Sequence, residues 1–149
     1  REHWERDALI AYQRAVELYA ANGFEARAAA TAKLMQQLET RLAELAGTDQ
    51  DGMRVATADN FSYVDPVDQS VSSGQGIRIL FENGSRIVFR LSGTGTRGAT
   101  LRVYMETYEN DQNRLQLETA EVMRPFAALA DRLAGIEALT GRSAPTVIT

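Results

Sequence analysis

The sequence contains no cysteine, which excludes disulfide bonds and thiolate metal sites. Its one histidine, His3, is interpreted as a surface residue and not as a metal ligand or catalytic base. No apolar run approaches the ~18 residues of a membrane helix, and the first residues show no signal-peptide pattern. A chain without cysteine fits a reducing compartment, so we expect a cytoplasmic protein with no membrane partner.

An excess of basic residues is also missing. The 16 Lys and Arg are outnumbered by 20 Asp and Glu, giving a net charge of −4. Nucleic-acid binding requires a basic field that displaces counterions, so we expect no nucleic-acid partner, although one local basic pocket remains compatible with this charge. The 149 residues, 44% of them hydrophobic, suffice for a single core. Because the chain opens on "REHW" without Met, we expect a fragment or a processed chain.

Two helices are predicted at the start of the chain, over residues 7–22 and 25–46. Apolar residues recur there at steps of three and four, which is typical of a helix with one buried face. In the first segment these residues are Leu9, Tyr12, Val16 and Tyr19, and in the second Met35, Leu38, Leu42 and Leu45. The dipeptide Asn22-Gly23 between the segments is a typical helix stop.

Alternating apolar residues then predict strands over residues 54–56, 77–82, 85–91 and 100–108. Asn83-Gly84 between two of them predicts a hairpin with a type I′ turn. A helix is predicted over residues 111–139, which Pro125 should kink or divide. The predicted class is α+β: an antiparallel sheet with helices packed on it, preceded by a helical hairpin. Asp65 and Asp68, on either side of Pro66-Val67, are interpreted as turn residues.

Three glycines, Gly93, Gly95 and Gly98, follow the spacing G-x-G-x-x-G. A dinucleotide-binding turn with this spacing leads into a helix, whereas the residues after Gly98 alternate as in a strand, so that interpretation fails. A kinase glycine loop lies between strands, but the chain is too short for the other kinase motifs. A hairpin loop that binds no ligand remains one interpretation.

The polar residues around the glycines favour a second interpretation, a phosphate site. Arg90 and Arg102 lie on the flanking strands, and Ser92 and Thr94 add hydroxyl groups. Glycines allow backbone N–H groups to converge on an anion, and guanidinium groups add bidentate contacts to phosphate oxygens. This chemistry suits a phosphate monoester.

The stretch "GSRIVFRLSGTGTRGATLRVYMETYE" resembles the C-terminal domain of phosphoglucomutases, in the α-D-phosphohexomutase superfamily. The resemblance extends upstream through "ADNFSYVDPVDQSVSSGQGIRILFENG" and downstream to "TGRSAPTVIT", so it covers residues 58–149. It implies a TATA-binding-protein-like α+β domain, the last of four in these enzymes. We therefore expect this domain at residues 51–149, with residues 1–50 as a helical segment leading from a missing third domain.

The resemblance also implies a ligand and a role. Five residues match the family's phosphate-contacting positions: Arg90, Ser92, Gly93, Thr94 and Arg102. The parent enzyme would be an isomerase of glucose and carbohydrate metabolism that interconverts α-D-glucose 1-phosphate and glucose 6-phosphate. It would use Mg²⁺ and a glucose 1,6-bisphosphate intermediate. The expected partners are a hexose phosphate and the missing mutase domains.

The family's catalytic loops do not occur in this sequence. These are a Thr-Ala-Ser-His-Asn phosphoserine loop, an Asp-Gly-Asp-x-Asp metal loop and a Gly-Glu-x-Ser sugar loop. We therefore expect a chain that is not catalytic alone and carries no cofactor of its own. Residues 5–38 also depart from the family pattern, through divergence or engineering. The alternative function is a non-catalytic scaffold or interaction module that keeps a relic phosphate loop.

Overall fold

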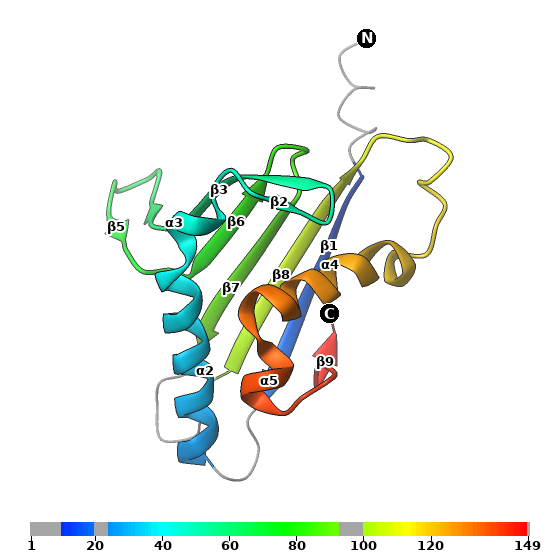
Figure 1. Cartoon of the computed structure of the whole chain (residues 1–149). Coiled ribbons are helices and arrows are strands. Elements are labelled where there is room, and N and C mark those ends of the chain that lie inside the picture. The colour runs from blue at the N-terminus through cyan, green and yellow to red at the C-terminus, as the bar shows by residue number, and fades with distance from the viewer. Residues whose placement is uncertain (1–9, 20–23, 93–99, 149) are drawn as a thin grey trace.

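The computed structural model describes the backbone of residues 10–19, 24–92 and 100–148, and within these ranges the side chains from residue 29 onward. In this part of the chain, antiparallel pairing joins seven strands into one sheet in the order β2-β3-β6-β7-β8-β1-β9 (Figure 1). The strands are β1 Ile10–Tyr19, β2 Asp49–Gln50, β3 Met53–Asn60, β6 Ile77–Phe81, β7 Arg86–Ser92, β8 Thr100–Glu109 and β9 Val147–Ile148. Between β3 and β6 the chain forms a separate hairpin of β4 Tyr63–Val64 and β5 Val71–Ser72.

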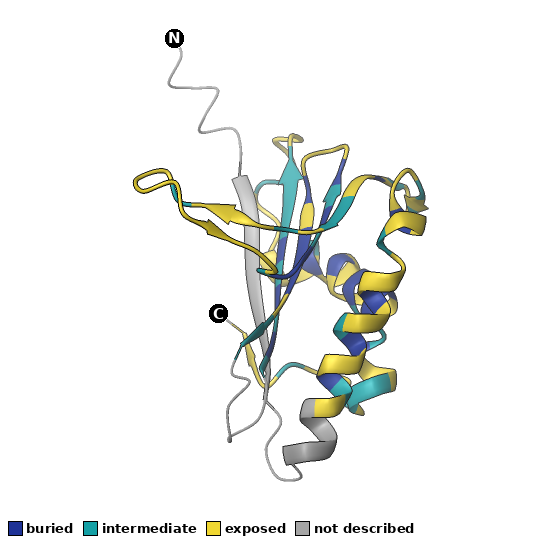
Figure 2. Ribbon diagram, turned by 90° about the vertical axis from the view of Figure 1, so that its left-hand side faces the viewer, coloured by how far each residue is buried: buried dark blue, intermediate teal, exposed yellow. Residues whose placement is uncertain are grey.

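The helices cover one face of the sheet (Figures 1 and 2). They are α2 Phe24–Thr40, α3 Leu42–Leu45, α4 Thr119–Ala134 and α5 Ile136–Thr140. Helix α2 packs against β6 and β7, and α4 packs against β8. The opposite face, here called the open face, is covered by none of these helices, and the β4–β5 hairpin projects on that side (Figure 2). The predicted α+β class, an antiparallel sheet with helices packed on it, is confirmed.

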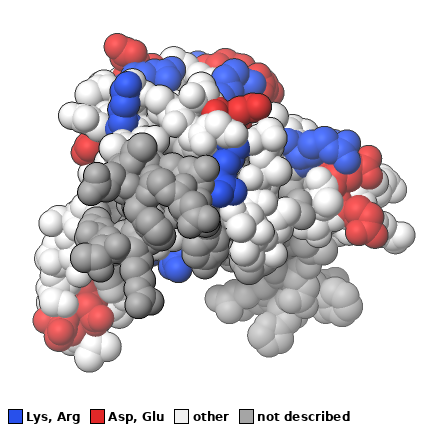
Figure 3. All heavy atoms as spheres, turned by 90° about the horizontal axis from the view of Figure 1, so that it is seen from below, with Lys and Arg blue, Asp and Glu red and all other residues white. Residues whose placement is uncertain are grey.

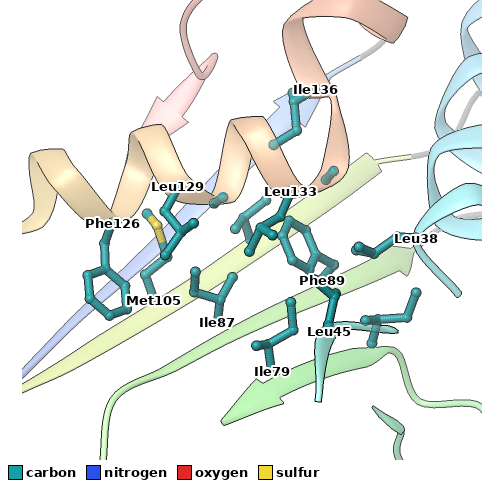
Figure 4. Packing of buried hydrophobic residues seen from close by; sticks show 14 of the residues in the cluster. Leu38, Leu45, Ile79, Ile87, Phe89, Met105, Phe126, Leu129, Leu133 and Ile136 are labelled. Atoms are coloured by element: carbon teal, nitrogen blue, oxygen red, sulfur yellow. The ribbon is translucent and has the colours of Figure 1, made fainter. Parts of the chain in front are cut away.

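The core lies between the sheet and the helices (Figure 4). Every second residue of the central strands enters it, as the alternating pattern predicts. The sheet side of the core consists of Val55, Ile77, Ile79, Phe81, Ile87, Phe89, Leu101, Val103 and Met105. Phe89 is 0% exposed, and the rings of Phe81 and Phe126 meet edge to face with centroids 5.8 Å apart. This packing fixes which residues of β7 and β8 remain on the open face.

The first predicted helix, over residues 7–22, is wrong: residues 10–19 form strand β1. β1 pairs with all ten residues of β8, from Ile10 opposite Glu109 to Tyr19 opposite Thr100. Four of the five even-numbered residues of the stretch are also apolar: Ile10, Tyr12, Val16 and Leu18. Without β1 the long strand β8 would end the sheet as an unpaired edge. Tertiary pairing thus overrides the helical spacing. The predicted division into residues 1–50 and 51–149 stays a prediction, although β1 and α2 pack against later elements.

The other helices form where they were predicted, with different ends. The helix expected over residues 25–46 is α2 followed by α3, with a break after Thr40. The helix expected over residues 111–139 begins only at Thr119 and continues through Pro125, which does not divide it. The division comes instead at Gly135, whose φ of 64° ends α4 in a left-handed conformation that suits glycine.

The hairpin between β6 and β7 is confirmed, but its turn is not type I′. Gly84 has a φ of 86°, whereas Asn83 is not among the described residues with positive φ. The N–H of Gly84 donates to the carbonyl of Phe81 (3.0 Å), and the N–H of Phe81 donates to that of Ser85 (2.9 Å). This pattern is typical of a three-residue loop in which a turn is followed by a left-handed glycine.

Candidate functional site

Arg90 and Arg102 lie directly opposite each other on β7 and β8. Their neighbours Phe89, Leu91, Leu101 and Val103 belong to the core or pack against it, so strand alternation puts both arginines on the open face. Arg90 is exposed and Arg102 is half-buried. Glu17 of β1 occupies the register position on the other side of Arg102. The structure thus brings together the two arginines that the sequence analysis selected.

The next pair toward the ends of these strands is Ser92 and Thr100. Both are half-buried, and the register puts them on the same face as the arginines, beside the start of the 93–99 connection. The predicted site residues Gly93 and Thr94 belong to this connection and lie outside the described residues. Figure 3 looks at this end of the molecule, where basic side chains appear at separate places and not as one continuous patch.

The side chain of Arg90 has a partner that the sequence analysis did not identify. Its Nη2 donates to Oε1 of Gln75 at 3.0 Å. Gln75 is half-buried and belongs to the segment that returns from the β4–β5 hairpin to β6. Because the amide is neutral, this hydrogen bond does not itself compensate the positive charge of Arg90. In the sequence, Gln75 stands out only as the middle residue of the "GQG" that precedes β6. No local pattern predicts its contact with Arg90.

Other arginines of the open face are engaged by carboxylates. Arg78 donates from Nε and Nη2 to the two oxygens of Asp59, at 3.0 and 2.7 Å. These hydrogen bonds raise the pKa of Arg78 above its ordinary value. Its guanidinium also lies over the ring of Phe61, 5.3 Å from the centroid. Arg86 donates from Nη2 to Glu106 at 2.8 Å. Because carboxylates already neutralise their charges, Arg78 and Arg86 are weaker candidates than Arg90 for binding an anion.

Asp65 and Asp68 act as turn residues, which confirms their interpretation. Oδ1 of Asp65 accepts from the N–H of Val67 at 2.7 Å, and Oδ1 of Asp68 accepts from the N–H of Ser70 at 2.8 Å. Hydrogen bonds from the side chain and then the backbone of Ser70 lower the pKa of Asp68. Both carboxylates are therefore occupied in stabilising the tip of the β4–β5 hairpin.

The described residues do not fit a resident metal ion. They contain no group of three or more His, Cys, Asp or Glu side chains arranged to hold one. The Mg²⁺ that the family resemblance implies for the parent enzyme therefore has no ligand set in the described ranges.

A separate hollow of about 380 Å³ lies on the helix-covered side of the sheet. It is lined by Val103 and Met105 of β8, by parts of α4 and α5, and by the segment that leads to β9. Arg124 and Arg142 belong to its lining. Val103 and Met105 point away from the face that carries Arg90 and Arg102, so this hollow is not part of the arginine site.

Comparison with known proteins identifies relatives of the whole described region. The family described as "Phosphoglucomutase-1, C-terminal domain" matches residues 19–146. A phosphoglucomutase of Rhizobium radiobacter is 58% identical over 116 residues, which are 78% of this chain and 21% of that protein. The cytoplasmic phosphoglucomutase of Solanum tuberosum is 43% identical over 150 residues, covering 100% of this chain and 26% of that protein.

The fold has a solved counterpart as well. The open form of the exocytosis-sensitive phosphoprotein pp63/parafusin, a phosphoglucomutase from Paramecium, superimposes with a TM-score of 0.77 at 40% identity. The match covers 94% of this chain and 23% of that one. The chain thus spans about a quarter of the length of these relatives. In the described ranges, no helix is both long and apolar enough to cross a membrane.

Proposed function

Because this chain belongs to the phosphoglucomutase family, as a C-terminal domain, we propose that it binds the phosphate group of a hexose phosphate on its open face. The proposed contacts come from Arg90, Ser92, Gly93, Thr94 and Arg102. The chain alone is not catalytic. Within a complete mutase it anchors the phosphate already present on the sugar, while phosphoryl transfer occurs at the far end.

The observation that carries this proposal is the direct pairing of Arg90 with Arg102 across β7 and β8. Directly opposite positions on one sheet face place the two side chains within reach of the same ligand. Phosphate can accept charge-assisted hydrogen bonds from both guanidinium groups, each stronger than a neutral one. The hydroxyl groups of Ser92 and Thr100, one pair further along, are of the type that donates to the remaining oxygens.

Binding a remote phosphate serves the reaction by orientation. Energy from a part of the substrate that does not react can hold the reacting hydroxyl in place for transfer. The complete enzyme would interconvert α-D-glucose 1-phosphate and glucose 6-phosphate in the cytoplasm, together with the missing mutase domains, Mg²⁺ and a glucose 1,6-bisphosphate intermediate. These properties belong to the longer chain and not to the residues described above.

A second candidate is an interaction module that keeps the loop as a relic. The β4–β5 hairpin favours it, because Tyr63, Val64 and Val71 are exposed there and Val67 at the tip is 91% exposed. The same hairpin surface is also compatible with contact to other mutase domains. Phosphate binding by the arginine pair therefore distinguishes the two candidates.

The test is the affinity of the chain and its arginine variants for inorganic phosphate, followed by NMR. Arg90→Ala and Arg102→Ala should each weaken binding by about 1.5–3 kcal/mol, the usual value of hydrogen bonds to charged groups. That loss corresponds to roughly 10- to 150-fold in Kd. Arg86→Ala is the matched control, because Arg86 lies on the same strand but is paired with Glu106. Equal affinities in all four proteins would remove the arginine pair from the site.

A further inference from the structure

The side chain of Arg90 on β7 forms a hydrogen bond with a residue that belongs to neither β7 nor β8. The hydrogen bond from its Nη2 to Oε1 of Gln75 measures 3.0 Å and links β7 to the segment before β6. An arginine side chain that is free in solution loses conformational entropy when it binds an anion. A partner that already restricts the side chain reduces that loss. Gln75 uses one N–H of the guanidinium and leaves the other donors for a ligand.

Gln75 is itself fixed by two hydrogen bonds of its own and by one of the neighbouring Gly76. Its backbone N–H donates to the carbonyl of Phe61 at 3.0 Å, and the N–H of Phe61 donates to the carbonyl of Gly76 at 3.0 Å. This reciprocal pair closes the base of the β4–β5 hairpin. The side-chain Nε2 of Gln75 donates to the carbonyl of Ser73 at 3.4 Å. With its NH₂ group directed to Ser73, the amide presents its oxygen to Arg90.

Gly76 brings this hairpin base into direct contact with β7. A Cβ atom added at residue 76 would lie 2.8 Å from Cγ of Arg90 and would clash with the carbonyl oxygen of Phe89. The φ of Gly76 is 143°, a value that other residues rarely adopt. The close approach thus depends on the missing side chain, and it places the preceding residue beside the guanidinium of Arg90.

We infer that Gln75 is a positioning residue for phosphate binding, which acts by holding the guanidinium of Arg90 before the ligand arrives. The inference rests on the proposed function, since it assigns a role to Gln75 only if Arg90 binds phosphate. Gln75 acts through Arg90 and makes no phosphate contact of its own. This role is distinct from stabilising the core, because the half-buried Gln75 is not part of the hydrophobic cluster.

Gln75→Met tests the inference, because methionine keeps the length of the side chain and removes the amide oxygen. We expect its Kd for inorganic phosphate to rise by about 2- to 10-fold, the range that corresponds to immobilising one flexible side chain. The melting temperature should stay unchanged. NMR signals of the Arg90 guanidinium should show faster motion than in the original chain, which a purely structural role would not produce.

Gln50→Met is the matched control. Gln50 is also half-buried and donates through Nε2 to the hydroxyl of Thr48 at 3.0 Å, but it lies on β2, three strand positions away from β7. Its phosphate affinity should equal that of the unaltered chain. Unchanged or tighter binding by Gln75→Met, with Arg90→Ala still weakened, would overturn the inference alone. No loss of affinity in Arg90→Ala would overturn the inference, and the same result in Arg102→Ala as well would overturn the proposed function.

Discussion

Replacing Gly76 by alanine should separate the β4–β5 hairpin from β7. The new methyl group would meet the carbonyl of Phe89 and the Cγ of Arg90, and the backbone would keep a φ of 143° that alanine disfavours. If the hairpin base stays in place, the backbone strain costs about 1–3 kcal/mol, and the steric overlap adds to it. If the base detaches, the two hydrogen bonds between Phe61 and residues 75–76 are lost, at about 0.5–1.5 kcal/mol each.

The variant will adopt whichever of these two states, strained or detached, costs less free energy. Gly76→Ala should therefore lower the free energy of unfolding by about 1–3 kcal/mol. Detachment also breaks the Arg90–Gln75 hydrogen bond, so phosphate affinity should fall together with stability. Urea denaturation measures the first effect, and hydrogen exchange at the Phe61 amide reports whether the base has opened.

Gly74→Ala is the control for backbone conformation. Gly74 has a φ of 62°, but a Cβ atom there would meet nothing within 4 Å. Gly74→Ala should lower the free energy of unfolding by about 1 kcal/mol, through the left-handed conformation alone. The Phe61 amide should stay protected from hydrogen exchange. Equal losses of unfolding free energy in both variants, with equal hydrogen-exchange protection at Phe61, would refute this prediction. The close approach of Gly76 to β7 would then contribute nothing to stability.

Two further predictions concern the hairpin tip and the core. The lowered pKa of Asp68 means that its hydrogen bonds stabilise the fold above the ordinary pKa of 3.8 and cease to do so as the pH falls through the lower folded-state value. Asp68→Asn should therefore be less stable than the unaltered chain at pH 7, with a gap that narrows below pH 3.8 in denaturation curves; a gap independent of pH would contradict this. Phe89 is 0% exposed, so Phe89→Ala should cost about 3–5 kcal/mol of unfolding free energy, and a loss below about 1 kcal/mol would contradict the packing described.

The sequence predicted the central meander and its arginine pair, because both depend on local alternation. Strands β6, β7 and β8 carry apolar residues at every second position, and this period alone decides which face Arg90 and Arg102 share. The pairing of the strands that carry Arg90, Ser92 and Arg102 was predicted because a short connection joins them, whereas their role in binding phosphate stays a prediction.

The elements that the sequence did not predict depend on distant partners. Residues 10–19 have apolar spacing compatible with a helix and with a strand, and the choice is made by pairing with β8, about 90 residues later. Gln75 likewise meets Arg90 only because Gly76 allows two backbone segments to touch. The end of α4 differs from the prediction because the sequence analysis expected a division at Pro125, whereas the left-handed φ of 64° at Gly135 is what stops the helix.

The most direct test of the central claim is an NMR titration of this chain with three ligands: inorganic phosphate, glucose 6-phosphate and glucose. If the open face binds the phosphate group of a sugar phosphate, the first two ligands should shift the amide signals of Arg90, Ser92, Thr100 and Arg102 in the same direction. Glucose should leave them unchanged. Shifts of these amides with glucose alone, or none with either phosphate ligand at millimolar concentration, would contradict the account.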